Sequence, residues 1–83
     1  MGIGQLMSYG YTTRVSNLNK QANRASLGVK LGRICIKQDI PVTEVAAQLG
    51  VSRQTVYNWF VGTHVPHADL NAAVRSLITS YRQ

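Results

Sequence analysis

The segment that most constrains the fold covers residues 42–62, VTEVAAQLGVSRQTVYNWFVG, because it holds two short amphipathic patterns separated by one glycine. In the first pattern the apolar residues are Val45, Ala46 and Leu49, a spacing that places them on one face of a helix. Gly50 follows directly, and a glycine there can adopt the left-handed conformation that ends many helices. The pattern therefore predicts a helix that ends at Leu49.

A second helix is predicted directly after this turn. The Ser52 hydroxyl can accept a hydrogen bond from the backbone amide of Gln54 or Thr55, so this helix is expected to start at Arg53. Its inward face consists of three apolar residues, Val56, Trp59 and Phe60. Two short helices joined by a tight glycine turn are the layout of a helix-turn-helix that recognises DNA.

Four side chains are expected to point outward from this second helix: Arg53, Gln54, Tyr57 and Asn58. A recognition helix places the residues that contact bases at such positions. Arg53 can bond guanine O6 and N7, and Gln54 or Asn58 can pair with adenine N6 and N7. Tyr57 can contact a phosphate or a thymine methyl group, while Ser52 and Thr55 are expected to serve the cap and phosphate contacts. The alternative for each residue is an ordinary solvated helix face.

The positive charge lies in the first half of the chain. The net charge is +6, and residues up to Lys37 include six basic residues but no Asp or Glu. A positive segment beside a helix-turn-helix fits an arm or a first helix that lies against phosphates, where released counterions supply affinity. Phosphate contacts are therefore expected from five of these residues, Arg14, Lys20, Arg24, Lys30 and Arg33. The alternative is ordinary charge for solubility.

Residues 1–26 and 27–83 are expected to play different roles. The first segment is rich in Gly, Ser, Thr and Asn without a sustained apolar period, which predicts a flexible basic arm, or one with a short helical turn between Val15 and Asn23. The second segment is predicted to be the DNA-binding domain. Ser26 can cap its first helix, which covers residues 27–38 with a buried stripe of Leu27, Leu31, Ile34 and Cys35. Pro41 should fix the start of the next helix near Val42 or Thr43.

A last helix is predicted from about His67 to Tyr81, after a loop that Pro66 closes. Apolar residues recur there every three or four positions, at Leu70, Ala73, Val74, Leu77, Ile78 and Tyr81. The end of this stripe, formed by Leu77, Ile78 and Tyr81, is expected to be either a homodimer contact or the closing side of the core.

The run over residues 27–78 resembles the Cro and lambda-repressor-like helix-turn-helix family, especially short phage-encoded regulators with YNWF and then glycine in the second helix. The likeness rests on several residues in order, Ala46, Gly50, Val51, Val56, Trp59, Gly62 and Pro66. It implies an all-α fold, a compact domain of four or possibly five helices with a partly flexible arm. It also implies a dimer or a cooperative monomer on DNA and a regulatory role. Val42 departs from the family, since many members place a polar residue there.

No catalytic or metal site can be assembled from the sequence, so neither enzyme activity nor a cofactor is expected. The carboxylates Asp39, Glu44 and Asp69 are scattered, and none forms a pair. The only two histidines, His64 and His67, lack a third ligand at zinc spacing.

We expect the protein to be located in the cytoplasm, which is the cytoplasm of the bacterial host if the chain is phage-encoded. The chain has one cysteine, so no disulfide can form within it. No apolar run approaches the roughly 20 residues of a membrane span, and the N-terminus lacks the apolar core of a signal peptide.

Double-stranded DNA is the expected partner, but two other function classes fit the sequence. The chain could bind a host protein, or serve as the DNA-recognition part of a packaging or recombination complex, if the strip at Leu77, Ile78 and Tyr81 is exposed. It could also coat DNA regardless of sequence. The mixture of Arg, Gln and Asn on the second helix argues against a coating protein, which would need Lys and Arg along that helix.

Overall fold

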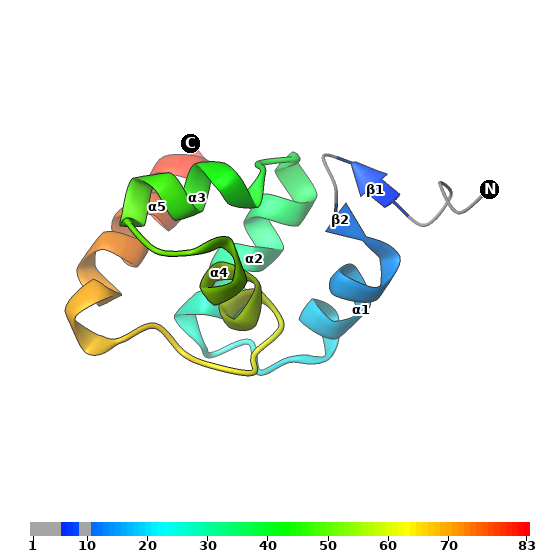
Figure 1. Cartoon of the computed structure of the whole chain (residues 1–83), viewed down its shortest axis with the longest axis horizontal. Helices are drawn as coiled ribbons and strands as arrows, with labels where there is room; N and C mark the ends of the chain where they lie inside the picture. Colours follow the sequence, from blue (N-terminus) through cyan, green and yellow to red (C-terminus); the bar gives the residue numbers. More distant parts are fainter. Residues whose placement is uncertain (1–5, 9–10) are drawn as a thin grey trace.

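Helices make up most of the structure, a computed structural model that describes residues 6–8 and 11–83 (Figure 1). Five α-helices lie in these residues: α1 (Thr13–Gln21), α2 (Leu27–Gln38), α3 (Val42–Leu49), α4 (Arg53–Phe60) and α5 (Asn71–Arg82). A 3-10 turn, η2 (Ala68–Leu70), leads directly into α5. Helix α2 is central, because α1, α4 and α5 all pack against it, whereas α3 packs on α4. The predicted all-α class is confirmed, with five helices in the described residues.

Two glycines let α4 approach α2 closely. A Cβ atom on Gly28 would lie 2.6 Å from the Cβ of Trp59, and one on Gly32 would lie 2.7 Å from the Cγ of Phe60. These glycines are four residues apart, so they share one face of α2. The two helices therefore meet along this face, with Trp59 and Phe60 buried between them.

The fully buried apolar residues of the core come from α2, α3, α4 and α5 and from one tyrosine that precedes α1, and Val15 of α1 packs against them. In the predicted stripe of α2, Leu31 and Cys35 are buried, and Leu27 and Ile34 are half-buried against the core. The other helices and the tyrosine contribute Tyr11, Val42, Val45, Ala46, Val56, Val74 and Ile78. Burial raises the pKa of the Cys35 thiol to about 12, with a further contribution from the nearby charge of Glu44. This thiol is therefore neutral at physiological pH.

The chain before α2 is more ordered than the sequence predicted. Two short antiparallel strands, β1 (Leu6–Ser8) and β2 (Tyr11–Thr12), precede α1, and Figure 1 shows them at one end of the molecule beside that helix. Tyr11 is 1% exposed, and its hydroxyl donates a 2.7 Å hydrogen bond to the backbone oxygen of Ile40. The Thr12 hydroxyl caps α1 by accepting a bond from the Val15 amide at 3.1 Å.

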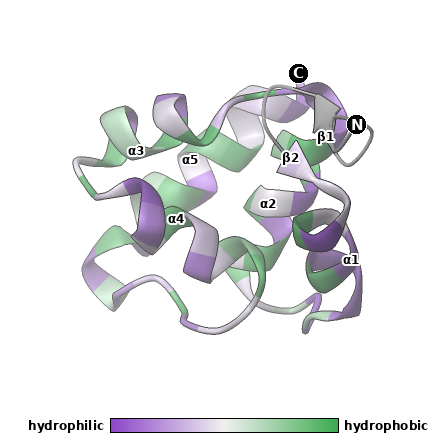
Figure 2. Cartoon of the chain, turned by 45° about the vertical axis from the view of Figure 1, so that its right-hand side comes forward, coloured by the Kyte–Doolittle hydropathy of each residue, from purple (hydrophilic) through white to green (hydrophobic). Residues whose placement is uncertain are grey.

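Residues 11–21 therefore form a strand and a helix where a flexible arm was expected, and α1 (Thr13–Gln21) overlaps the short helical turn that the sequence allowed between Val15 and Asn23. Apolar residues are few in α1, which is mostly hydrophilic (Figure 2), so an apolar period could not reveal it. A buried polar side chain, Asn19, attaches it to the core instead. Residues 1–5 and 9–10 of the predicted arm lie outside the described residues. The division of roles at Ser26 stays a prediction.

Ser26 stands at the N-cap position of α2, as predicted, but its hydroxyl makes no capping bond. The Oγ atom is buried and has no hydrogen-bond partner among the described residues. Only the backbone oxygen of Ser26 takes part in the first turn, where it accepts a 3.0 Å bond from the Lys30 amide. The side-chain cap predicted here is thus wrong, because the side chain points into the protein rather than along the helix.

The last helix starts four residues later than predicted. The ring nitrogen Nδ1 of His67 accepts a bond from the Asp69 amide at 3.2 Å, which starts the 3-10 turn before α5. At the other end, Ile78 is 8% exposed, and the Tyr81 hydroxyl donates a 3.1 Å bond to the Glu44 carboxylate. Leu77 and Tyr81 are half-buried against the core. Ile78 therefore helps to close the core, while the homodimer contact predicted through Leu77, Ile78 and Tyr81 stays a prediction.

Candidate DNA-binding surface

The turn between α3 and α4 has the geometry that the sequence predicted. Gly50 ends α3 with φ of 68°, a left-handed conformation that glycine adopts without a side-chain clash. The amides of Gly50 and Val51 both donate to the backbone oxygen of Ala46, which Val51 contacts at 3.1 Å. Ser52 then caps α4, because its Oγ accepts a 3.1 Å bond from the Thr55 amide. Two local signals, one glycine and one serine, therefore fix how the two helices meet.

Helix α4 separates into a buried and an open face. Val56, Trp59 and Phe60 are buried, as predicted. Arg53 and Gln54 are exposed at the N-terminal end of the helix, while Tyr57 and Asn58 are half-buried. The four side chains expected to contact bases thus reach the surface to different extents, with the first turn of α4 the most accessible.

The polar side chains of α4 hydrogen-bond to one another. The Gln54 Nε2 donates a 3.1 Å bond to the Asn58 Oδ1, one helical turn further on. The Ser52 and Thr55 hydroxyl oxygens lie 2.9 Å apart and share a hydrogen bond. The first pair fixes one side-chain amide against the other, and still leaves one Gln54 N–H and its carbonyl oxygen for another partner.

Tyr57 is supported from outside the helix-turn-helix, by a contact that the sequence did not reveal. Its ring meets the edge of the Tyr11 ring, with centroids 6.5 Å apart and planes at 79°. Tyr11 in turn lies against Phe60, at a centroid distance of 6.2 Å. The segment before α1 therefore holds the Tyr57 ring in place. The only sequence signal for this contact was the presence of an aromatic residue, Tyr11, in a segment without an apolar period.

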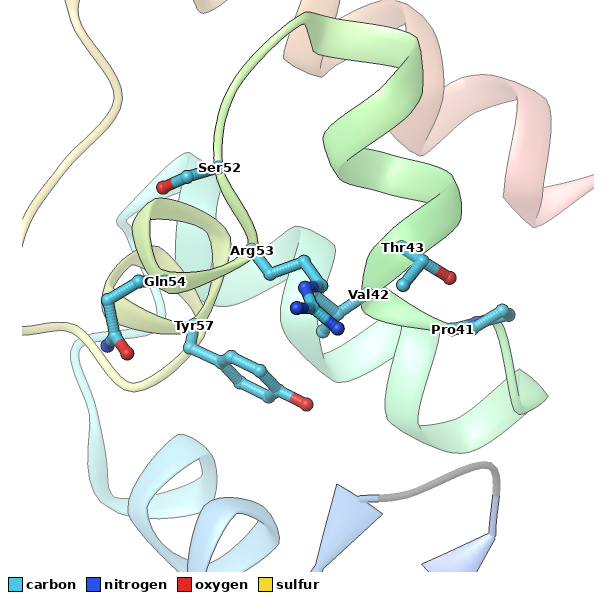
Figure 3. Close-up of a pocket in the computed structure, with 7 residues that line it drawn as sticks. All are labelled: Pro41, Val42, Thr43, Ser52, Arg53, Gln54 and Tyr57. Carbon is cyan, nitrogen blue, oxygen red and sulfur yellow. The ribbon is translucent and has the colours of Figure 1, made fainter.

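A cleft of about 620 Å³ opens between the starts of α3 and α4 (Figure 3). Its lining residues come from the two helices and their caps, Pro41, Val42, Thr43, Ser52, Arg53, Gln54 and Tyr57. In Figure 3 the Arg53 and Tyr57 side chains extend from α4 toward the start of α3, whereas Gln54 and Ser52 point away from it. A guanidinium and a phenol are thus presented together, and Gln54 occupies a separate side of the helix.

The basic residues in the first half of the chain lie on α1, on α2 and in the loop between these helices. Arg14 lies exposed on α1, and Arg24 is exposed in the loop that follows it. Lys30 is exposed on α2, while Lys20 and Arg33 both line a second cleft, between α1 and α2. None of these five residues lines the cleft at the start of α4. Contact with DNA phosphates stays a prediction for each of them.

The histidine pair does not assemble a metal site in the described part of the chain. His67 lies 3.5 Å from the Asp69 carboxylate, with both side chains largely exposed. Among the described residues, no group of three His, Cys, Asp or Glu side chains could hold a metal ion. Within the same part of the chain, no helix combines the length and the apolar character that a membrane crossing requires.

Comparison with known proteins gives one match. Residues 34–60 match a family model described as a homeodomain-like domain, and this stretch runs from the second half of α2 to the end of α4. Neither a search of curated proteins nor a search of solved structures found a match. The match supports a helix-turn-helix of the DNA-binding kind, and the narrower resemblance to Cro and lambda repressor is not confirmed. The chain therefore contains a helix-turn-helix, similar to the homeodomain-like domain, whose implied partner is DNA.

Proposed function

We propose that this chain binds double-stranded DNA in a sequence-specific way, with α4 as its recognition helix, and regulates transcription at an operator. The observation that carries the proposal is the division of α4 into two faces. Val56 and Phe60 hold it against the core, while the first turn presents Arg53 and Gln54 to solvent next to a capped N-terminus. A recognition helix enters the major groove with this end toward the base edges.

The chemistry of the open face suits base recognition. Arg53 carries the fork of N–H donors that pairs with guanine O6 and N7. Gln54 is held by its bond to Asn58, so less side-chain entropy is lost when its remaining amide groups pair with adenine N6 and N7. Tyr57, fixed by Tyr11, directs its hydroxyl to a phosphate or its ring to a thymine methyl group.

Phosphate contacts would come from two sources around this helix. Ser52 and Thr55 lie at the N-terminus of α4, where backbone amides and the helix dipole attract an anion. Arg14, Arg24 and Lys30 are exposed and supply positive charge. Because residues 11–21 belong to the packed structure, deletion of everything before Ser26 would damage the fold. Single substitutions such as Arg14→Gln are the appropriate test.

A regulator fits this surface better than a protein that coats DNA. Arg53 is the only cation among the α4 residues that reach the surface, beside two amides and a phenol, and a coating protein would carry a row of cations there. A partner-protein role relies on an exposed strip at Leu77, Ile78 and Tyr81. This role is less favoured because Ile78 is buried and the other two residues are half-buried. A dimeric, phage-type regulator remains part of the proposal, with the end of α5, where Leu77 and Tyr81 are half-buried beside Ile78, as the dimer contact.

The test is selection of bound duplexes from a random DNA pool by the full chain, with a parallel titration of binding against salt. Enrichment of a motif that is lost in Arg53→Ala is expected. An inverted repeat with half-sites about one helical turn apart would support a dimer. Binding without enrichment would favour the coating protein, and failure to bind any duplex would contradict the proposal.

A further inference from the structure

A second cleft, of about 470 Å³, lies between α1 and α2, which pack side by side. Three cationic side chains line it: Lys20 comes from α1, and Arg33 and Lys37 come from α2. The Asp39 carboxylate lines it too, so the charged groups of the lining sum to +2. Like charges on two separate elements repel each other across such a cleft, and a bound anion would offset this cost.

The cleft is partly organised before any ligand arrives. The Arg33 Nη2 donates a 3.3 Å bond to the backbone oxygen of Asn19, which limits the movement of the guanidinium. Asn19 is itself 2% exposed, and its amide donates to the backbone oxygens of Val29 and Phe60. An arginine fixed in this way keeps several N–H donors in a fork that matches a tetrahedral oxyanion.

The remaining lining supplies the other parts of an anion site. Lys20 and Lys37 are exposed, so their flexible ammonium groups can close on an anion from two sides. Ser16, 4% exposed, lines the same cleft with a hydroxyl that can donate a hydrogen bond. Two mobile ammonium groups and one fixed guanidinium favour a compact anion with several oxygens over a single carboxylate.

We infer that the cleft between α1 and α2 binds one phosphate group, held jointly by Lys20, Arg33 and Lys37. This goes beyond separate contacts of Lys20 and Arg33 along a DNA strand, because the three side chains share one anion and Lys37 joins them. The phosphate can come from the backbone of bound DNA, in which case the inference rests on the proposed function. It can also come from a small phosphorylated molecule.

The site itself is tested without DNA. The full chain, labelled with ¹⁵N, is titrated with inorganic phosphate, with sodium chloride at equal ionic strength as reference. Saturable shifts of the amide signals around Lys20 and Lys37 are expected with phosphate only, with affinity reduced several-fold in Lys20→Gln and in Lys37→Gln. Both side chains are exposed, so both variants should fold, as the dispersion of the same spectra verifies.

Lys30→Gln is the matched control, because Lys30 is exposed on the same helix but does not line the cleft. It should bind phosphate like the unmodified chain. Shifts that do not saturate, or that chloride reproduces, would overturn the inference. So would a phosphate affinity that is equal in Lys37→Gln and in the unmodified chain.

A second experiment, which measures DNA affinity at several salt concentrations, identifies the source of the phosphate. If the cleft takes a backbone phosphate, Lys20→Gln and Lys37→Gln should each make the negative slope of log K against log salt shallower by up to about 0.9. The double variant should then reduce the magnitude of the slope by no more than about 0.9 in total, because both residues share one phosphate. Unchanged slopes, together with saturable phosphate binding, would assign the cleft to a small phosphorylated ligand. The phosphate titration decides on the site even if no duplex binds.

Discussion

The side-chain amide of Asn19 donates a 2.7 Å hydrogen bond to the backbone oxygen of Phe60, the last residue of α4. The final carbonyl groups of a helix have no partner within it, so Asn19 acts as a cap supplied by another element. The same nitrogen donates to the backbone oxygen of Val29 at 3.2 Å. One buried side chain therefore joins α1, α2 and the end of the proposed recognition helix.

Replacement of Asn19 by alanine should destabilise the whole domain. The substitution removes the donor that Asn19 supplies to the Phe60 carbonyl at the end of α4, and an unsatisfied buried group costs roughly 1 to 3 kcal/mol. We expect the free energy of unfolding to fall by about 2 kcal/mol or more. Urea denaturation, monitored through the fluorescence of the single tryptophan, Trp59, measures this free energy of unfolding.

Asn17→Ala is the matched control, because Asn17 is an exposed asparagine on the same helix. Its effect should stay within about 0.5 kcal/mol, as for most surface substitutions. Equal stabilities of the Asn17 and Asn19 variants would show that α1 does not anchor α4.

Two glycine substitutions should destabilise the protein for different reasons. Gly28→Ala places a methyl group 2.6 Å from the Cβ of Trp59 and 3.1 Å from its backbone oxygen, so the backbone of α4 must move. We expect a loss of about 1 to 3 kcal/mol from this overpacking, although alanine favours a helix more than glycine does. Gly50→Ala meets no atom within 4 Å but requires φ of 68°. It should cost about 1 to 2 kcal/mol.

Substitution by asparagine distinguishes the steric clash at Gly28 from the backbone strain at Gly50. Gly50→Asn should be more stable than Gly50→Ala, because asparagine tolerates the left-handed conformation. Gly28→Asn should be less stable than Gly28→Ala, because a larger side chain makes the clash with Trp59 worse. Thermal unfolding of the four variants provides the ranking, and the opposite order at either site would refute the cause assigned to it.

The stability of the fold should decrease as the pH rises above about 9. Burial raises the pKa of the Cys35 thiol from 9.0 to about 12, so the unfolded chain loses this proton at a lower pH than the folded chain does. The stabilisation is complete below pH 9 and is lost progressively toward pH 12. Burial also raises the pKa of Tyr11 and of Tyr81, so these two phenols add to the loss of stability as the pH approaches 10.

The measurement is the urea midpoint at pH 7, 9 and 10 for the unmodified chain and for Cys35→Ala. The variant should be less stable throughout, because it leaves a small cavity, but its midpoint should change less between pH 9 and 10. A thiol reagent should also react slowly with the native protein. Identical pH dependence in both chains would remove Cys35 as the cause.

The sequence predicted the α3–turn–α4 unit closely, because its signals are local. The Gly50 amide donates to the Ala46 oxygen, and the Ser52 hydroxyl accepts from the Thr55 amide. Both partners lie within four residues, so a short stretch of sequence is enough to predict these contacts. The roles of Tyr11 and Asn19 could not be predicted in this way. Their partners, the backbone oxygens of Ile40 and Phe60, lie 29 and 41 residues further along the chain.

The polar groups of Tyr11 and Asn19 also made their burial hard to predict from the sequence. Asn19 is buried because its hydrogen bonds are satisfied, whereas an apolar period detects only residues buried by the hydrophobic effect. The strip at the end of α5 was open to two interpretations for a related reason. Whether Ile78 faces solvent or the core depends on where α5 packs, and no residue near Ile78 specifies that.

Arg53→Ala should weaken binding to the selected duplex without affecting the fold. The side chain is exposed at the start of α4, so its removal should leave the packing of the core intact. Loss of a bidentate contact to guanine should cost roughly 1 to 3 kcal/mol and relax the preference at one base pair. Fluorescence anisotropy with the selected duplex, and with duplexes substituted at each position in turn, measures both effects.

Arg75→Ala is the control for charge alone, because Arg75 is exposed on α5 and does not line the cleft at the start of α4. It removes the same charge, so it should lower affinity for all duplexes slightly and equally, with the base preference intact. The decisive quantity is the ratio of affinities for the selected and the substituted duplex. A ratio that falls in Arg53→Ala but not in Arg75→Ala assigns base recognition to Arg53. If the two variants lower affinity alike and leave the ratio unchanged, Arg53 contacts only phosphates, and the sequence preference must come from Gln54, Asn58 or Tyr57.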